Sequence, residues 1–320
     1  MMRRLRLWLW VVSVVLAGSA IGQPLAVDCI APAKPGGGFD LTCRLAQELL
    51  RGIDKPPVRI RYLPGGIGAV AFDRAASQHW SDPNVLVAFS TGSLVNLVQG
   101  KFGPHQPHDV RWLVTFGTEY GVVAVRRDSP IQSLQALLAL LRKDPAGAAF
   151  GASGTVGSQD WIKAALVVKA AGGDHRALRF VSFEGGGQAL AALKGSHVDV
   201  FCGDAAEAVG AAADVRILAV LAPHRLGGRL AGVPTAREQG ADIVWPTVRG
   251  LYMGPGVPEK DYAEWVRTMR RLTATQRFLQ LAQHSGLDPL PLAGGDVDAW
   301  VDRTVAELRG LAQSLHLRVR

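Results

Sequence analysis

Short runs of apolar residues alternate along the chain with segments in which apolar residues recur every three or four positions. The first pattern predicts β-strands and the second predicts amphipathic helices. Strands are expected at 25–31, 58–63, 85–90, 112–117, 122–126, 148–151, 179–183, 198–202, 217–221 and 250–254. Helices are expected at 41–50, 70–78, 134–142, 160–171, 188–194, 235–239, 259–274, 275–285 and 296–316. Because strands alternate with helices in two successive sets, the pattern indicates an α/β fold.

Three of the predicted strand-to-helix junctions are rich in glycine. They are the loops 35–40, 151–158 and 184–187, and the second of them reads GASGTVGS. A helix N-terminus carries unpaired N–H donors and a partial positive charge, and glycine lets a ligand approach them closely. Asp40 and Ser158 also fit the alternative of ordinary helix caps. Together, the three loops favour a site for a carboxylate or phosphate group.

Other kinds of chemistry match the sequence poorly. None of the three loops ends in the Lys and Ser or Thr of a Walker phosphate loop, and 66–71 fits only the loose dinucleotide pattern GxGxxA. His105 and His108 lie in a proline-rich segment without a third ligand, so we interpret them as solvated and expect no metal or cofactor. Ser153 lacks the GxSxG context of a hydrolase nucleophile. The residues therefore indicate a binding protein, not an enzyme.

The first 23 residues differ in composition from the rest of the chain. Three arginines precede an apolar run at 7–17, and small residues follow it up to Gly22. This order is typical of a secretory signal peptide, and an apolar run of about 11 residues is shorter than the roughly 20 that span a bilayer. We therefore expect residues 1–23 to be a cleaved signal peptide and the mature protein to be exported.

The charge of the chain is modestly basic. The formal net charge is +8, and loss of three arginines and no acidic residue with the signal peptide leaves +5. A hydrophobic fraction of 48% excludes a disordered chain. Because the basic residues form no stripe with interleaved aromatic residues, no nucleic-acid partner is expected. A moderate positive charge suits a small anionic ligand better.

Two of the three cysteines are placed so that a disulfide is an open possibility. Cys29 lies on a predicted strand and Cys43 on the following helix, and an exported protein meets conditions that permit the bond. The spacing does not show whether the two side chains face each other, so both the bridged and the free form remain open. Cys202 lies in an apolar run and is expected to be a small buried residue.

Five stretches of the chain carry a family resemblance. They are 29–40 (CIAPAKPGGGFD), 150–160, 198–204, 232–240 (GVPTAREQG) and 252–255. In this order, over about 25–317, they resemble the TctC or Bug family, the periplasmic substrate-binding proteins of tripartite tricarboxylate transporters. The first stretch looks closest to the branch that handles citrate-like tricarboxylates. The resemblance implies a two-lobed, flytrap-like periplasmic-binding-protein architecture of type II, with lobe one formed by 24–122 and 224–320 and lobe two by 123–223.

The resemblance also implies which residues bind the ligand. Two loops that face each other across the cleft would hold its carboxylate, partly through ordered water. They match Gly36, Gly37, Gly38, Phe39 and Asp40 in lobe one, and Ala152, Ser153, Gly154, Thr155, Ser158, Gln159 and Asp160 in lobe two. Further contacts are expected at Ser90, Ser93, Asn96, Gly186 and Asp204. Because a carboxylate beside an anionic ligand would repel it, we expect Asp40 to cap its helix.

The function implied by the resemblance is that of a periplasmic receptor. It would capture a citrate-like tri- or dicarboxylate and deliver it, as a monomer, to the membrane subunits of a tripartite tricarboxylate transporter. The alternative is an accessory protein that presents a bound carboxylate to a sensor histidine kinase.

Overall fold

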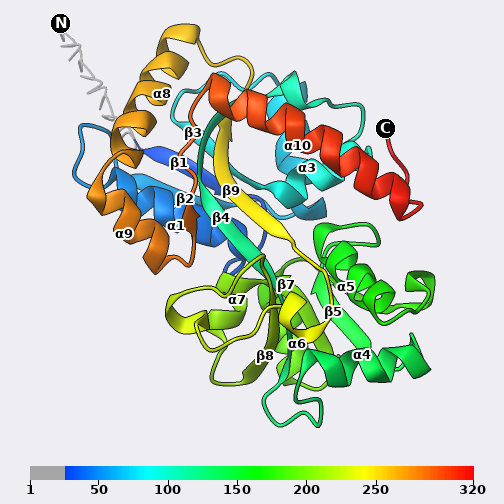
Figure 1. The fold of residues 1–320 in the computed structure, drawn as a ribbon. Helices are drawn as coiled ribbons and strands as arrows, with labels where there is room; N and C mark the ends of the chain where they lie inside the picture. The colour runs from blue at the N-terminus through cyan, green and yellow to red at the C-terminus, as the bar shows by residue number, and fades with distance from the viewer. Residues whose placement is uncertain (1–25) are drawn as a thin grey trace, which may run out of the picture.

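The strands of the protein hydrogen-bond into one mixed sheet, seen in a computed structural model that describes residues 26–320 (Figure 1). The expected signal peptide, 1–23, lies outside these described residues. Along the sheet the order is β2 (Val58–Tyr62), β1 (Val27–Ala31), β3 (Val85–Ser90), β9 (Pro246–Met253), β4 (Arg111–Arg126), β7 (Val200–Asp204), β5 (Ala149–Ser153) and β6 (Arg179–Phe183). Two more strands, β8 (Val215–Leu221) and β10 (Asp288–Pro289), pair with β4. No helix among residues 26–320 has the length and apolarity to cross a membrane.

The long strand β4 joins two halves of the molecule. Its first part, 111–120, pairs with β9, and its last part, 121–126, pairs with β7 and β8. We call the part around β1, β2, β3 and β9 the first half, and the part around β5, β6, β7 and β8 the second half. The expectation of two separate strands at 112–117 and 122–126 is wrong. Polar Glu119 interrupts the apolar pattern, but it is buried in the continuous strand and paired with Arg249 of β9.

Helices connect the parallel strands of each half and cover the sheet. Those of the first half are α1 (Gly38–Leu50), α2 (Ala69–Ser77) and α3 (Thr91–Val98). Those of the second half are α4 (Leu134–Lys143), α5 (Gln159–Ala170), α6 (Gly186–Lys194) and α7 (Ala205–Gly210). The chain returns to the first half with α8 (Glu259–Thr273), α9 (Gln276–His284) and α10 (Gly295–Ser314), as Figure 1 shows. The α/β expectation is therefore confirmed.

Five short 3-10 helices complete the described part of the chain. They are Gly66–Gly68, Pro107–Asp109, His175–Ala177, Gly228–Leu230 and Arg237–Gln239. Of the helix expected at 235–239, only the short 3-10 turn Arg237–Gln239 forms. His105, which we interpreted as solvated, is instead buried, and its Nε2 lies 2.9 Å from Asp73 Oδ1.

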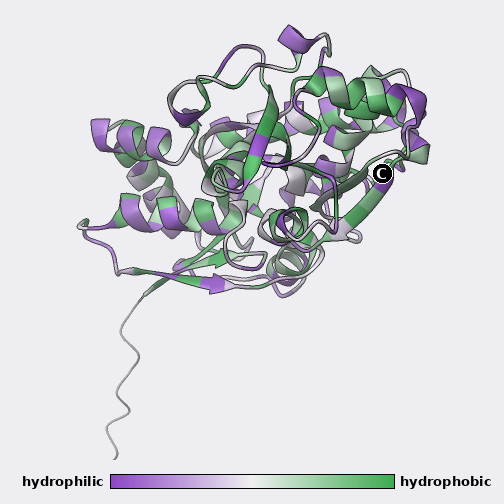
Figure 2. Ribbon diagram, turned by 90° about the horizontal axis from the view of Figure 1, so that it is seen from below, coloured by the Kyte–Doolittle hydropathy of each residue, from purple (hydrophilic) through white to green (hydrophobic). Residues whose placement is uncertain are grey.

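The helices are amphipathic, and hydrophobic and hydrophilic residues alternate along their turns (Figure 2). In α10, for example, Val297, Val301, Val305 and Leu308 recur every three or four positions and are all buried. This spacing places them on one face of the helix. The burial of that face is the reason why this long C-terminal segment forms a helix in the position that its pattern predicts.

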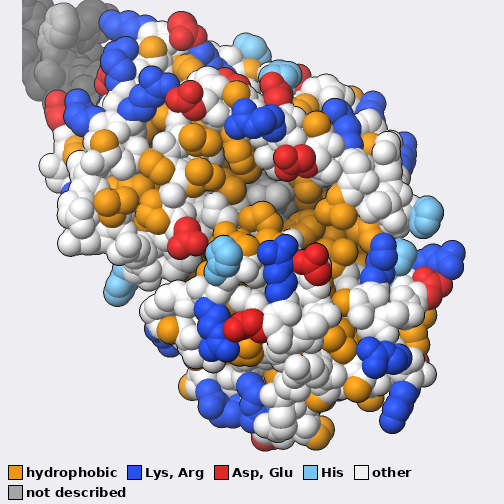
Figure 3. Space-filling view, in the orientation of Figure 1, with side chains coloured by type: hydrophobic (Ala, Val, Ile, Leu, Met, Phe, Trp, Pro, Cys, Tyr) orange, Lys and Arg blue, Asp and Glu red, His pale blue; other side chains and the backbone are white. Residues whose placement is uncertain are grey.

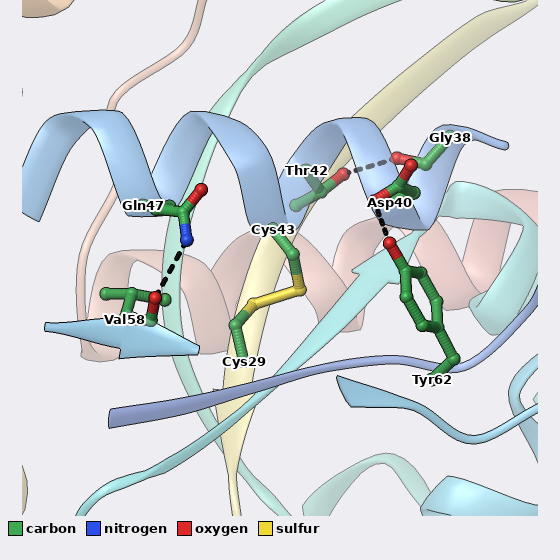
Figure 4. Close-up of a disulfide and its surroundings, with 8 residues drawn as sticks. All are labelled: Cys29, Gly38, Asp40, Thr42, Cys43, Gln47, Val58 and Tyr62. Atoms are coloured by element: carbon green, nitrogen blue, oxygen red, sulfur yellow. Dashed lines mark hydrogen bonds between the residues drawn. A yellow bond between two sulfur atoms is a disulfide. The ribbon is translucent and has the colours of Figure 1, made fainter. Parts of the chain in front are cut away.

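A disulfide between Cys29 and Cys43 fastens α1 to the sheet (Figure 4). The two Cα atoms lie 5.7 Å apart, and Gln47 of α1 also donates to the carbonyl of Val58 at 2.8 Å. The structure thus selects the bridged form, which the sequence left open. Closing this loop stabilises the fold by about 3 kcal/mol in the chain-entropy account. Cys202 is free and buried, as expected, and burial raises the pKa of its thiol.

Candidate functional site

Four helix N-termini meet between the two halves. Those of α1 and α3 come from the first half, and those of α5 and α6 come from the second half. A methyl group on Gly187 of α6 would lie 3.7 Å from the carbonyl oxygen of Gly36, and one on Gly92 of α3 would lie 2.8 Å from Gln159 of α5. In Figure 3 hydrophobic side chains gather in the hollow between the halves, and charged side chains surround it. The glycine-rich junctions singled out from the sequence are therefore brought together.

The α1 loop presents backbone to this region, and its acidic residue faces elsewhere. Asp40 Oδ2 accepts from the N–H of Gly36 at 2.9 Å and from Arg44 at 3.1 Å, while Oδ1 accepts from the Tyr62 hydroxyl at 2.9 Å (Figure 4). The N-cap of α1 is Gly37, which makes no side-chain capping bond, so the expectation that Asp40 caps the helix is wrong. Asp40 instead holds the loop in shape, and its side chain leaves the first-turn amides of α1 to other acceptors.

The α5 loop is held together by its own polar side chains. Ser158 is the N-cap of α5 and accepts from the N–H of Trp161 at 3.2 Å, which confirms the cap interpretation. Ser153 donates its hydroxyl and its N–H to Oδ2 of Asp160. Gly154 has a φ of +82°, a conformation that favours glycine. These contacts fix the loop, whereas Thr155 at its tip is exposed.

Gln159 reaches from the second half toward the first half. Its Nε2 donates to Asp204 Oδ2 at 3.3 Å. Its buried Oε1 has no hydrogen-bond partner among the described residues and lies against Gly92, in the first turn of α3. A buried acceptor without a partner is costly in free energy. Gln159 therefore presents an acceptor where the two halves meet.

The other predicted residues of the first half belong to α3. Ser90 and Ser93 form a reciprocal capping box at its start, in which the N–H of Ser90 donates to Ser93 Oγ at 3.3 Å. Asn96 lies in the next turn and is buried. These residues are near the meeting point, although the two serine side chains are engaged in capping.

A buried cluster of charges lies behind the helix N-termini. Lys163 of α5 is fully buried, and its Nζ lies 2.7 Å from Asp160 Oδ1 and 2.6 Å from Asp204 Oδ1. Arg249 of β9 lies 2.8 Å from Asp204 Oδ2 and also pairs with Glu119. Asp204 thus joins two cations from the two halves. Both oxygens of the Asp204 carboxylate are engaged in these contacts, and Oδ1 also accepts from the Thr247 hydroxyl at 3.0 Å.

The pKa values of the cluster follow from burial and pairing. Burial opposes ionisation of Asp204, but Lys163 and Arg249 outweigh it and lower the pKa. For Asp160 and Glu119 burial prevails over the adjacent cation and raises the pKa. Two cations and four carboxyl groups, including that of Glu207, share the region. Burial and the neighbouring carboxyl groups of Asp204 and Asp160 raise the pKa of Glu207 to about 8.

Sequence reasoning missed the cations of this cluster. The expected site was built from loops and helix N-termini, yet Lys163 is buried with no exposed surface and Arg249 is 3% exposed. Both positions carry a signal in the sequence: Lys163 follows Asp160 by three positions within an apolar helix, and Arg249 interrupts an apolar strand. Charged residues are almost never fully buried unless they are paired.

Contacts at the far side of α3 also join the halves. Gln99 donates to the carbonyl of Gly157 at 2.5 Å, and Lys101 donates to the carbonyl of Val156 at 2.7 Å. A separate open groove of about 510 Å³ lies outside the site, beside β1, β2 and the end of α2. Its charges include Asp28 and Arg61, which pair with each other at 3.0 Å.

Several solved structures share this fold. MatC from Rhodopseudomonas palustris, with bound malate, is 21% identical, with a TM-score of 0.77 over 90% of this chain and 99% of that chain. A second R. palustris protein, with adipate, is 18% identical, with a TM-score of 0.83 over 92% and 98% of the chains. The periplasmic binding protein BugD is 18% identical, with a TM-score of 0.82 over 92% and 99%. These similarities show the architecture of periplasmic binding proteins.

In sequence, no curated protein matches the chain significantly. The profile of the family described as the tripartite tricarboxylate transporter family receptor, TctC, matches residues 44–317. This match begins within α1 and spans both halves, including the N-termini of α3, α5 and α6. The chain therefore belongs to the TctC family of periplasmic solute-binding receptors.

Proposed function

We propose that this protein is an exported receptor that binds a di- or tricarboxylate between its two halves and delivers it to the membrane subunits of a tripartite tricarboxylate transporter. The observation that carries the proposal is the meeting of the α1 and α6 N-termini around one carboxyl group. Glu207 Oε1 accepts from the N–H of Gly38, at the start of α1, at 3.0 Å. Its other oxygen lies against Gly186, at the start of α6. The chain itself thus marks a position that accommodates a carboxylate.

The chemistry of binding would come mainly from backbone amides. The first N–H groups of a helix have no partner within the helix, and an anion near them gains about 0.3–1 kcal/mol from the helix dipole. Glycines at 36–38 and 186 allow close approach. The side chains of Ser153, Ser158 and Asp160 would act by holding the α5 loop, and Gln159 would present its amide group to the ligand.

The two halves would act as lobes that close on the ligand. We propose lobe one as 24–122 with 224–320 and lobe two as 123–223. The division is supported by β4, which changes partners between Tyr120 and Gly121. Contacts such as Arg249 with Asp204 join the lobes and would favour the closed arrangement.

The ligand class is supported by two kinds of observation. Two structures of the same fold hold malate and adipate, which are dicarboxylates. The stretch 29–40 of this chain looks closest to the branch that handles citrate-like tricarboxylates. We therefore propose a carboxylate with two or three acid groups, citrate included.

Calorimetric titration of the purified protein tests this function. Malate, adipate and citrate are titrated separately, and dimethyl malate serves as the uncharged control. We expect saturable binding of at least one acid with a Kd in the micromolar range, and no binding of the ester. Absence of binding by all three acids would contradict the proposal.

A further inference from the structure

The carboxyl group of Glu207 occupies the space between two helix N-termini. Glu207 is the third residue of α7, and its Oε1 accepts from the N–H of Gly38 at 3.0 Å. A methyl group built on Gly186 would lie 1.8 Å from Oε2, and one built on Gly37 would lie 3.5 Å from Oε1. An acidic side chain of the protein therefore fills the position where the first turns of α1 and α6 would bind an anion.

The surroundings of Glu207 are more acidic than basic. The charged groups that face it are Asp204 on β7, Asp160 on α5, Glu119 on β4 and Arg249 on β9. Among residues 26–320, no basic side chain forms an ion pair with Glu207. The α6 helix has no charged residue before Lys194, and the acidic residue of the first turn of α1, Asp40, is engaged with Gly36, Arg44 and Tyr62. The hydrogen bond that holds Glu207 thus comes from the backbone N–H of Gly38, and Arg249 is the one cation among the charged groups that face it.

We propose that Glu207 is an internal competitor of the ligand: its carboxyl group and a ligand carboxylate occupy in turn the same position, at the N–H of Gly38 and beside Gly186. This inference rests on the proposed function. An N–H donor serves one such acceptor well, and two carboxylates in one site repel each other. Glu207 would therefore lower the affinity for carboxylates and limit binding to ligands that displace it.

Displacement of Glu207 requires only a local movement. Its side chain is half-buried, and it belongs to a helix of six residues. Rotation about the side-chain bonds can turn the carboxyl group toward solvent without changing the backbone.

The competition depends on protonation. Burial and the neighbouring carboxylates raise the pKa of Glu207 to about 8. Below this pH the group is mostly neutral and repels an arriving carboxylate little. Above it, the ionised group interacts more strongly with the helix N-termini and repels the ligand. The affinity for a carboxylate should therefore fall as the pH rises through 8, by up to tenfold per pH unit.

Calorimetric titration with malate, and in parallel with adipate, tests the proposal at pH 6.5 and pH 9. The variants are Glu207→Ala and Glu207→Gln, and Glu307→Ala is the control because it removes the same charge from an exposed position on α10. At pH 9 we expect Glu207→Ala to bind at least tenfold more tightly than the wild type. The affinity of Glu207→Ala and Glu207→Gln should change little with pH, while Glu307→Ala behaves as the wild type. Circular dichroism checks that each variant is folded.

The possible outcomes separate this inference from the proposed function. If the wild type binds a carboxylate and Glu207→Ala binds it equally or more weakly at both pH values, the competitor role is wrong and the receptor function stands. If the wild type binds and Glu207→Ala binds at least tenfold more tightly at pH 9, both are supported. If no protein binds either acid, the receptor function itself fails, and the inference that rests on it fails too.

Discussion

Replacing Lys163 by Met should destabilise the protein strongly, because it removes the cation from a buried cluster. Lys163 Nζ lies 2.7 Å from Asp160 and 2.6 Å from Asp204, and its side chain has no exposed surface. At an effective dielectric constant of ~20, each contact has a Coulomb energy of about 6 kcal/mol. The wild type also bears the desolvation cost of the buried lysine, and this cost offsets much of the Coulomb energy. Removal of one partner from a buried ion pair typically costs about 3–5 kcal/mol, which is the loss expected here.

Urea denaturation followed by tryptophan fluorescence measures this loss. Lys169→Met is the matched control, because Lys169 lies on the same helix and is exposed. Surface substitutions of this kind usually change stability by about 0.5 kcal/mol or less. A loss for Lys163→Met that is no larger than for Lys169→Met would refute the reasoning.

The pH dependence of the same variant gives a second check. Without Lys163, the carboxyl groups of Asp160 and Asp204 face each other in a buried site, which raises their pKa values in the folded protein. An acid whose pKa is raised on folding destabilises the folded state increasingly as pH rises toward that pKa. The deficit of Lys163→Met relative to the wild type should therefore be larger at pH 7.5 than at pH 5. A deficit that grows as the pH falls would contradict this assignment.

Two further changes test the site and its support. Gly186→Ala places a methyl group 1.8 Å from Glu207 Oε2 and should weaken malate binding at least tenfold by calorimetry. Gly187→Ala is the control and should weaken binding far less, because its methyl group lies 3.7 Å from the nearest atom. Equal malate affinities of the two variants would show that the ligand does not use the position beside Gly186. The double variant Cys29→Ser/Cys43→Ser should lose about 3 kcal/mol in the free energy of unfolding in urea, and reduction of the wild type should reproduce the loss.

The helices, most strands and the glycine-rich junctions could be predicted from the sequence because they depend on local patterns. The burial of Val297, Val301 and Val305 in α10 follows from their spacing alone. The continuity of β4 could not be predicted in this way. Glu119 breaks the apolar pattern, and its partners Arg249 and the N–H of Ala206, both distant in sequence, compensate its burial.

In the candidate site, too, local features could be predicted from the sequence and contacts between distant segments could not. The sequence identifies the loops, since glycine before a helix is a local feature. It does not show which side chain enters the space between two helices that are far apart in the chain. Asp40 and Glu207 are both acidic residues near a helix start, yet Asp40 turns back onto its own loop and Glu207 reaches the N–H of Gly38. Such pairings depend on the tertiary structure.

The central claim is that a carboxylate binds to backbone amides where the two halves meet, and nuclear magnetic resonance measures it most directly. In ¹⁵N-labelled protein titrated with malate, the amide signals of Gly38 and Gly186 report on the starts of α1 and α6. The account predicts that both amide protons move downfield and saturate with the Kd measured by calorimetry. Unchanged signals at both glycines, while residues elsewhere respond to malate, would contradict it.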